Sequence, residues 1–380
     1  MDDNTKYVKK IAIIAHQAFS LYNFRGALIQ ELTSKGFVVY ALAPDYDYEM
    51  KCKVTSLGAI PFDYSLERTG MHPGRDFHDL LKLILLVHRL KVDISFSYSI
   101  KPVIYGSFAA RISGIKRVFS MVEGLGHVFI EDGEQGKLKK NILIDLVLAM
   151  YKIAFRCSTK VFFLNPDDAY YFISRGLIGK KKTALIPGIG VNLKHFVPAP
   201  FPDNVVFLLI ARLIREKGIY EYIQAIRLIK MEYHDVEFLL VGDVDSNPSS
   251  ITREEADSWV ADGLVEWPGA VADVRPWIAR SSVFVLPSYR EGVPRSTQEA
   301  MAMGRAVVTT NVPGCRETVD EGENGFMVPA RDAFSLKEAM CRFIRDSSLI
   351  KKMGMKSRIK CEDTFNEKDI NKKILDIIED

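Results

Sequence analysis

Short apolar runs recur along the chain, and each is followed by a segment whose apolar residues have helical spacing. These runs predict strands at residues 11–15, 38–43, 94–98, 118–122, 161–164, 205–210, 236–241, 283–286, 306–309 and 325–328. Strands that alternate with helices form a parallel sheet that is covered on both faces. Because the runs fall into two series, the pattern predicts an α/β fold with two Rossmann-like domains in tandem.

A segment without helical spacing separates the two series. Residues 187–202 are rich in Pro and Gly, which is typical of a linker. We therefore predict one domain over residues 1–198 and a second over 199–364, with a terminal helix at about 365–380 that packs back on the first. Ligands of parallel sheets bind at the carboxyl ends of the strands, so two domains that face each other would bind a ligand in the cleft between them.

The composition narrows the class of protein. Hydrophobic residues make up 48% and charged residues 26% of the 380 positions, which is typical of a folded globular protein. Lys and Arg number 51 against 48 Asp and Glu, and a net charge of +3 gives no reason to expect nucleic acid as a partner. The five cysteines lack metal-site spacing and predict reduced thiols in a cytoplasmic protein. No apolar run is long enough to cross a bilayer, and the first run is too short for a signal peptide.

The clearest chemistry follows the predicted strand at 283–286. The sequence PSYREGVPRSTQEAMAMG predicts a loop and then a helix that begins near Pro294, because Pro suits the first helical position. A helix amino terminus offers unpaired N–H groups and a positive dipole to a phosphate. Glu299 lies in this helix, and the tilt of its Cα–Cβ bond directs the side chain back toward the loop that contains Glu291. A carboxylate at that place can accept hydrogen bonds from two neighbouring ribose hydroxyls.

A second strand end carries cations. The sequence ARLIREKG, residues 211–218, again leads from a strand into a helix, and it places Arg212 and Lys217 where they can converge on a diphosphate. Arg makes forked contacts with phosphate, and Lys supplies a point charge. Together they would neutralise the charge on a departing nucleotide without a metal or another cofactor. Arg215 is a competing candidate for this role.

These residues together resemble a known family. The Glu-x7-Glu pattern of Glu291 and Glu299, with Arg212 and Lys217 upstream and PGCRETVDEGENGFMVPARD downstream, is similar to retaining glycosyltransferase family 4, which has the GT-B fold. The resemblance covers essentially the whole chain and is strongest from about residue 206 to residue 332. It implies two Rossmann-like domains that face each other across a cleft, the first binding the acceptor and the second the nucleotide-sugar donor.

The resemblance also assigns roles. In that family the residue that matches Glu299 binds the ribose, the one that matches Glu291 contacts the sugar, and those that match Arg212 and Lys217 hold the diphosphate. The implied reaction keeps the anomeric configuration by front-face displacement, in which the leaving phosphate helps to deprotonate the acceptor. The donor contacts implied for this chain are Arg212, Lys217, Glu291, Gly292, Val293, Pro294 and Glu299.

The first domain departs from the family pattern at the end of its first strand. The family often has a glycine-rich loop there, whereas this chain has HQAFSLYNFRGALIQEL. Ser20, Asn23 and Arg25 are therefore candidates to contact the acceptor or the sugar. Arg25 is equally suited to be a surface cation on its helix.

A second departure follows the strand at 118–122. Many family members have a His there that contacts the sugar, and Glu123 takes about its place in this chain. His127 follows in the same loop. We predict Glu123 as a catalytic residue and His127 as a possible sugar contact, and the sequence leaves open which of the two touches the sugar.

The departure at Glu123 resembles bacterial members that extend polyprenyl-diphosphate-linked glycans. It implies transfer of a hexose or an N-acetylhexosamine from a UDP-sugar to a lipid-linked saccharide, in the assembly of O-antigen, capsule or a glycoprotein glycan. Such an enzyme would be peripheral on the cytoplasmic face of the membrane. Residues 76–91 and 137–156 combine apolar bodies with basic flanks and are candidates to lie on anionic lipid, although both are equally suited to pack in the first domain.

The sequence is also compatible with two other functions, and one of its motifs resembles a metal site. A GT-B sugar-nucleotide epimerase would interconvert donors without an acceptor, and a non-enzymatic sugar-binding protein would close a similar cleft on its ligand. Asp243-Val-Asp245 matches the Asp-x-Asp metal motif of another glycosyltransferase fold, but it follows a strand as an ordinary turn would. We therefore predict an enzyme that uses no metal.

Overall fold

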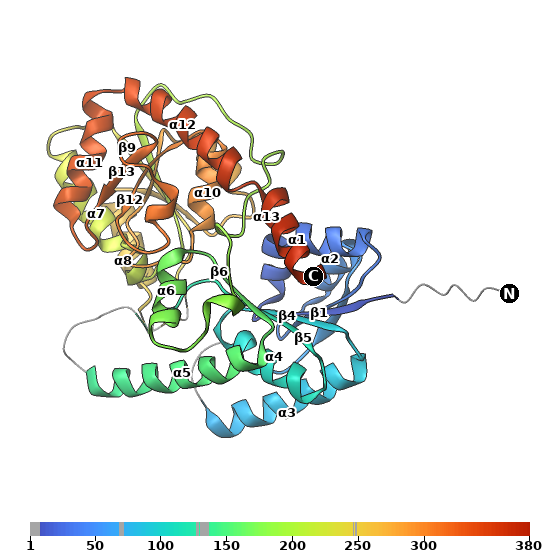
Figure 1. The fold of residues 1–380 in the computed structure, drawn as a ribbon. Helices are drawn as coiled ribbons and strands as arrows, with labels where there is room; N and C mark the ends of the chain where they lie inside the picture. The colour runs from blue at the N-terminus through green and yellow to red at the C-terminus, as the bar shows by residue number, and fades with distance from the viewer. Residues whose placement is uncertain (1–7, 68–71, 127–128, 130–136, 246, 248) are drawn as a thin grey trace. The chain divides into compact units, whose positions relative to one another are not determined.

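A computed structural model describes residues 8–67, 72–126, 129, 137–245, 247 and 249–380 (Figure 1). The chain divides into two compact units. The first comprises Met1–Ile186 together with Asn371–Asp380, and the second comprises Pro187–Ile370. Each unit is built on one parallel sheet, as the alternation of strands and helices predicts.

The first unit contains a sheet of seven strands in the order β3-β2-β1-β4-β5-β6-β7. The strands are β1 (Lys10–Ile14), β2 (Val38–Ala43), β3 (Ile60–Asp63), β4 (Ile94–Tyr98), β5 (Arg117–Val122), β6 (Lys160–Phe163) and β7 (Thr183–Leu185). The helices are α1 (Ala18–Ser34), α2 (Tyr48–Ser56), α3 (Pro73–Leu90), α4 (Ile100–Ile112), α5 (Lys137–Cys157), α6 (Pro166–Ser174) and the short η2 (Lys180–Lys182). Both α3 and α5 pack against α4.

The second unit contains a sheet of six strands in the order β10-β9-β8-β11-β12-β13. The strands are β8 (Val206–Ile210), β9 (Glu237–Val241), β10 (Glu266–Gly269), β11 (Val283–Leu286), β12 (Ala306–Thr310) and β13 (Gly325–Val328). The helices are η3 (Arg215–Lys217), α7 (Ile219–Lys230), α8 (Arg253–Ala261), α9 (Arg275–Ala279), α10 (Arg295–Ala302), η4 (Arg316–Thr318), α11 (Ala333–Arg345) and α12 (Ser348–Thr364).

The two middle strands of the second sheet are continuous apolar runs. β8 (VFLLI) and β11 (VFVL) are buried along their whole length, as expected for parallel strands covered on both faces. Every strand predicted from the apolar runs is present, with ends that differ by one residue at most.

Three strands were not predicted, and all lie at sheet edges. β3 and β7 form the two edges of the first sheet, and β10 forms one edge of the second. Each is short and partly exposed, and β3 (IPFD) and β10 (EWPG) contain a proline, which is tolerated at an edge because one side of the strand needs no partner. Without a full apolar run, these strands leave no periodic signal in the sequence.

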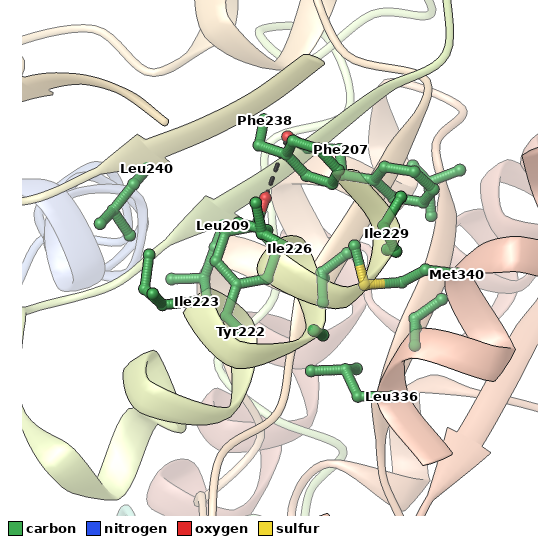
Figure 2. Close-up of a cluster of buried hydrophobic side chains, with 14 of the residues drawn as sticks. Phe207, Leu209, Tyr222, Ile223, Ile226, Ile229, Phe238, Leu240, Leu336 and Met340 are labelled. Atoms are coloured by element: carbon green, nitrogen blue, oxygen red, sulfur yellow. Dashed lines mark hydrogen bonds between the residues drawn. The ribbon is translucent and has the colours of Figure 1, made fainter. Parts of the chain in front are cut away.

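A cluster of buried hydrophobic side chains packs against β8 in the second unit (Figure 2). Phe207 of β8 stacks on Phe238 of β9 with 5.7 Å between the ring centroids. Tyr222 of α7 is fully buried, and its hydroxyl donates a hydrogen bond to the backbone carbonyl of Phe207 at 3.1 Å. Leu336 and Met340 of α11 belong to the same cluster. This packing fixes β8 and α7, and therefore both ends of the loop that joins them.

One buried arginine anchors the predicted linker segment to the second unit. Arg305 donates hydrogen bonds at 2.9 Å to the carbonyls of Ala199, Pro200 and Ile278, and its guanidinium lies over the ring of Phe201. Burial lowers the pKa of Arg305 to about 10, so the side chain stays charged at neutral pH. The segment 187–202 contains no helix or strand, in agreement with its Pro and Gly content.

The last helix, α13 (Glu367–Glu379), runs across the division between the units. Its residues from Asn371 onward count with the first unit, where Arg117 donates to the carbonyl of Ile378 and Lys35 pairs with Glu379 at 3.0 Å. Within the described part of the chain, no helix combines the length and the apolar character that crossing a membrane requires.

Candidate active site

In each sheet the strand order reverses at one point. In the first unit the sheet extends from β1 to β3 on one side, and from β4 to β7 on the other; in the second unit β8 and β11 are the corresponding neighbours. The loops that follow the two strands at such a point diverge, and the crevice between them is the usual ligand site of these folds. The candidate residues of the second unit follow β8 and β11, so the topology places them at this crevice.

Lys217 and Glu291 form an ion pair across the crevice of the second unit. Lys217 lies at the end of η3, after β8, and its Nζ donates to Oε1 of Glu291 in the loop after β11. The hydroxyl of Ser288 donates to the same oxygen at 2.8 Å. Only 20% of the Lys217 side chain and 12% of the Glu291 side chain are exposed, so salt and water screen this pair less than a surface pair.

Two glycines allow the loops around this pair to approach closely. Gly218 has a φ of 72°, and a Cβ added there would lie 2.2 Å from the carbonyl oxygen of Pro287. Gly314 has a φ of 85°, and its added Cβ would lie 2.2 Å from the carbonyl oxygen of Glu291. The N–H of Glu291 also donates to the carbonyl of Pro313 at 3.0 Å. A side chain at either glycine would therefore push apart the backbone segments that place the ion pair.

Helix α10 carries the second glutamate. It begins at Arg295, one residue after the predicted start, because Pro294 has an extended backbone and serves as the N-cap. Glu299 accepts a hydrogen bond from Nε of Arg295 at 3.0 Å, so its side chain runs toward the amino end of the helix, which is the direction that the Cα–Cβ tilt predicts. Burial raises the pKa of the Glu299 carboxyl, and the charge of Arg295 partly opposes this effect.

Arg212 has a different partner from Lys217. Its Nη1 donates to Oδ2 of Asp245, after β9, at 2.8 Å, and half of the Arg212 side chain is exposed. The structure therefore does not bring Arg212 and Lys217 onto one group, since each is paired with an acid from a different neighbouring strand. Asp243, the other acid of the Asp-x-Asp motif, pairs with Arg253 at 2.7 Å. Both acids of that motif thus bind arginines.

In the first unit, Arg25 is buried. It is 2% exposed, and its Nη2 donates to Oε1 of Glu123 at 2.5 Å. The alternative that Arg25 is a surface cation is therefore wrong. Ser99 donates to the other carboxylate oxygen of Glu123 at 2.9 Å. Glu123 directly follows β5 and Ser99 directly follows β4, so these partners meet at the carboxyl ends of adjacent strands.

The remaining candidate residues of the first unit differ in burial and in their hydrogen-bond partners. Ser20 is 3% exposed, and its hydroxyl is hydrogen-bonded to the carbonyl of Gln17 at 2.7 Å and to the hydroxyl of Tyr98 at 2.8 Å. Asn23 is exposed and donates to the carbonyl of Phe19 at 3.1 Å, on its own helix. His127 lies outside the described residues. A direct contact of any of these residues with a sugar stays a prediction.

Several contacts of the candidate residues could not be predicted from the sequence. The residues Arg25 and Glu123 are 98 positions apart, and Lys217 and Glu291 are 74 apart. Only the strand order, which a single sequence does not reveal, makes these pairs neighbours. Arg215, the competing cation, lies over the ring of Tyr220 with 5.5 Å to its centroid.

Comparison with solved structures defines the fold. The chain is similar to sucrose-phosphate synthase from Thermosynechococcus elongatus, with a TM-score of 0.80 and 20% identity over 98% of both chains. It is also similar to HepE from Anabaena in complex with UDP and glucose, with a TM-score of 0.77 and 18% identity over 98% of this chain and 99% of that one. The two parallel sheets therefore form a GT-B fold, as predicted.

Comparison of the sequence with known proteins indicates the activity. The family model of glycosyl transferases group 1 matches residues 204–346. The chain is 29% identical, over 90% of both chains, to the N,N'-diacetylbacillosaminyl-diphospho-undecaprenol alpha-1,3-N-acetylgalactosaminyltransferase of Campylobacter jejuni. It is 27% identical, over 77% of this chain and 76% of the relative, to the UDP-Gal:alpha-D-GlcNAc-diphosphoundecaprenol alpha-1,3-galactosyltransferase of Escherichia coli. The chain is therefore a glycosyltransferase, and its residues 204–346 match group 1, in agreement with the predicted resemblance to retaining glycosyltransferase family 4.

Proposed function

We propose that this glycosyltransferase moves a hexose or an N-acetylhexosamine from a UDP-sugar to a saccharide carried on a lipid diphosphate. The names of the Campylobacter and Escherichia coli relatives both specify a diphospho-undecaprenol acceptor, and the second also specifies a UDP-linked donor. HepE was solved with UDP and glucose. The product would be an intermediate of a surface polysaccharide, such as O-antigen or capsule, or of a glycoprotein glycan.

The observation that carries this proposal is the Lys217–Glu291 pair next to the amino end of α10. A diphosphate that enters the crevice meets a lysine ammonium and the positive end of a helix dipole. The half-exposed Arg212 can exchange Asp245 for a phosphate by moving only its side chain. In this arrangement the two cations stabilise the charge that develops on the departing UDP.

The two glutamates then bind the rest of the donor. Glu299 accepts hydrogen bonds from the ribose hydroxyls, because its carboxylate lies toward the amino end of α10. Glu291 is oriented by Lys217 and by the Ser288 hydroxyl, and it accepts a hydrogen bond from the sugar. We assign neither glutamate as a covalent nucleophile. The leaving phosphate takes part in deprotonating the acceptor hydroxyl, as front-face displacement requires.

A panel of sugar nucleotides tests the donor. A bound donor raises the thermal midpoint in proportion to the logarithm of its concentration above Kd, so UDP-sugars should shift the midpoint more than GDP-sugars do. The nucleotide and sugar released without an acceptor are then identified. Free UDP and free sugar support a transferase, whereas an interconverted UDP-sugar would indicate an epimerase. A protein that neither binds nor hydrolyses any sugar nucleotide would contradict the proposal.

A membrane-facing surface on α3 is part of the proposal. Phe77, Leu81 and Leu85 are spaced four residues apart and are exposed by 62%, 43% and 62%. The two acids of the helix, Asp76 and Asp79, are both buried, so every charged side chain that α3 exposes over residues 74–90 is basic or a histidine. An apolar stripe with basic residues beside it and no exposed acid over residues 74–90 matches the surface of an anionic bilayer. This surface would bring the enzyme to a lipid-linked acceptor on the cytoplasmic face of a membrane.

The α5 helix has a similar stripe. Ile142, Leu146 and Ile153 are exposed by 60%, 49% and 50%, although Asp145 is exposed between them. Because the exposed acid makes α5 less suited than α3 to an anionic membrane, membrane binding is tested with a substitution on α3. Vesicles that contain an anionic phospholipid should co-sediment with the wild type and much less with Leu81→Asp, while neutral vesicles should retain neither. Met355→Asp, an exposed apolar position on α12, is the matched control. Equal binding of Leu81→Asp and the wild type would contradict this part of the proposal.

A further inference from the structure

Glu123 is held from two sides at the crevice of the first unit. Nη2 of Arg25 donates to Oε1 at 2.5 Å, and Oγ of Ser99 donates to Oε2 at 2.9 Å. Arg25 is 1% exposed at its side chain, whereas 23% of the Glu123 side chain is exposed. The carboxylate is therefore bound by donors on its inner side, while part of it faces solvent. An ionised carboxylate only accepts hydrogen bonds, and with one donor on each oxygen it can accept further ones.

The guanidinium that binds Glu123 is itself fixed. It lies over the ring of Tyr98 with 4.8 Å to the centroid, and its Nη2 also contacts Sδ of Met121 at 2.8 Å. Tyr98 is fully buried, and its hydroxyl is hydrogen-bonded to that of Ser20 at 2.8 Å. Residues from α1, β4 and β5 thus enclose Arg25. Because the side chain has lost its freedom on folding, it can orient a partner without further loss of entropy on ligand binding.

Ser99 supplies an independent observation. Its φ of 72° and ψ of 157° lie in a region that glycine alone adopts easily, and a serine there is strained. It occupies the N-cap of α4, yet its side chain does not cap that helix, which is the usual role of serine at this place. The hydroxyl instead donates to Glu123. Strain of this kind persists where the surroundings impose it, and it concentrates at functional sites.

We propose that Arg25 and Ser99 are positioning residues that hold Glu123 as an oriented hydrogen-bond acceptor for a hydroxyl of the bound saccharide. This inference rests on the proposed function and adds to it a sugar contact in the first unit, with the residues that support it. The hydroxyl belongs either to the transferred sugar or to the acceptor sugar. Glu123 in this role keeps its charge throughout the reaction and removes no proton.

Ser99→Gly separates this role from a structural one. The variant loses the hydroxyl and also the backbone strain, so its thermal midpoint should equal or exceed that of the wild type. Loss of one hydrogen bond to a charged group corresponds to a fall in kcat/KM of about tenfold or more. Lys91→Gly is the matched control, because Lys91 also has a positive φ, of 48°, and lies at the end of α3. In the assay of UDP release without an acceptor, in which no membrane takes part, Lys91→Gly should keep full activity.

Substitutions of Glu123 and Arg25 test the same role through kcat/KM and its pH dependence. Glu123→Gln keeps the size of the side chain, and about a tenfold fall in kcat/KM is expected from the weaker neutral acceptor. Its pH profile should keep the shape of the wild-type profile, whereas loss of the ascending limb would mean that Glu123 is a general base. Arg25→Lys should retain part of the activity that Arg25→Met loses, since lysine keeps the positive charge but not the geometry of the guanidinium that donates from Nη2 to Glu123. Arg111→Met, an exposed arginine on α4, is the control.

Two assays identify the source of the hydroxyl. One follows UDP release from a UDP-sugar without an acceptor, and the other follows transfer to an undecaprenyl-diphosphate-linked N-acetylhexosamine. A fall in both rates for Ser99→Gly and Glu123→Gln assigns the contact to the transferred sugar, and a fall in transfer alone assigns it to the acceptor. Wild-type kcat/KM for both variants in both assays would overturn the inference while leaving the proposed function intact. A wild type without turnover of any UDP-sugar would overturn both.

Discussion

Replacing Glu299 by Gln should weaken donor binding without weakening the fold. The glutamine keeps the size of the side chain and one oxygen that can accept from Arg295, which donates to Glu299 at 3.0 Å. It removes the charge that makes this residue a strong acceptor for two ribose hydroxyls. The perturbation is therefore confined to the interaction that the donor is proposed to make.

The expected magnitude follows from the hydrogen bonds. A hydrogen bond to a charged group contributes about 1.5–3 kcal/mol, and a neutral one about 0.5–1.5 kcal/mol. With both ribose bonds weakened from charged to neutral ones, by about 1 kcal/mol each, Glu299→Gln should raise the Kd for UDP by about ten- to a hundredfold, since about 1.4 kcal/mol corresponds to a factor of ten. Glu299→Ala, which removes both, should raise the Kd by about a hundredfold or more, a change of at least about 2.7 kcal/mol.

The pKa of Glu299 sets the sign of the effect on stability. Burial raises this pKa in the folded state, so the carboxyl favours folding most at low pH, and that contribution is lost as the pH rises through the folded-state pKa. A glutamine does not titrate. At pH 7.5 the thermal midpoint of Glu299→Gln without ligand should therefore be no lower than that of the wild type.

Isothermal titration calorimetry with UDP and thermal unfolding without ligand check the two halves of this prediction. The control is Glu254→Gln, an exposed glutamate in the first turn of α8, which should change neither quantity. An unchanged Kd for UDP in Glu299→Gln would refute the assignment of Glu299 to the ribose. A lower midpoint would refute the view that its ionised carboxylate disfavours the fold.

Three further outcomes follow from the contacts of the second unit. Lys217→Met should lower kcat by about a hundredfold, because it removes a cation that stabilises the leaving group, and Lys217→Arg should recover part of this loss in the same steady-state assay. Gly218→Ala should lower the chemical denaturation midpoint, since its Cβ would lie 2.2 Å from the carbonyl oxygen of Pro287; an unchanged midpoint would show that these loops yield easily. Arg305→Met should lower the free energy of unfolding in urea by about 3–5 kcal/mol, because buried carbonyls lose their donor.

The sequence predicted the parts of the fold that are encoded locally. Continuous apolar runs such as VFLLI in β8 identify buried parallel strands, because both faces of each strand are covered. The edge strands β3, β7 and β10 carry no such pattern, since partial exposure allows polar residues and proline. The start of α10 was predicted to within one residue from Pro294, which is the N-cap instead of the first helical residue.

The sequence predicted which strand ends carry the candidate residues, but it did not predict which of these residues contact one another. Glu291 and Lys217 were both candidates, but their pairing depends on β8 and β11 being neighbours, which a single sequence does not reveal. Asp245 as the partner of Arg212 depends in the same way on β9 lying beside β8. The strain at Ser99 left no signal, because a serine is ordinary at an N-cap and only the backbone angles reveal its cost.

A crystal structure of the protein with UDP would show directly whether the residues after β8 and β11 bind the donor. We expect the diphosphate oxygens to lie within about 2.7–2.9 Å of Nζ of Lys217 and of the guanidinium of Arg212, as charge-assisted hydrogen bonds do. We also expect the ribose hydroxyls to lie against the carboxylate of Glu299. UDP bound away from the crevice between β8 and β11, or bound there with its ribose away from Glu299, would contradict the proposed donor site.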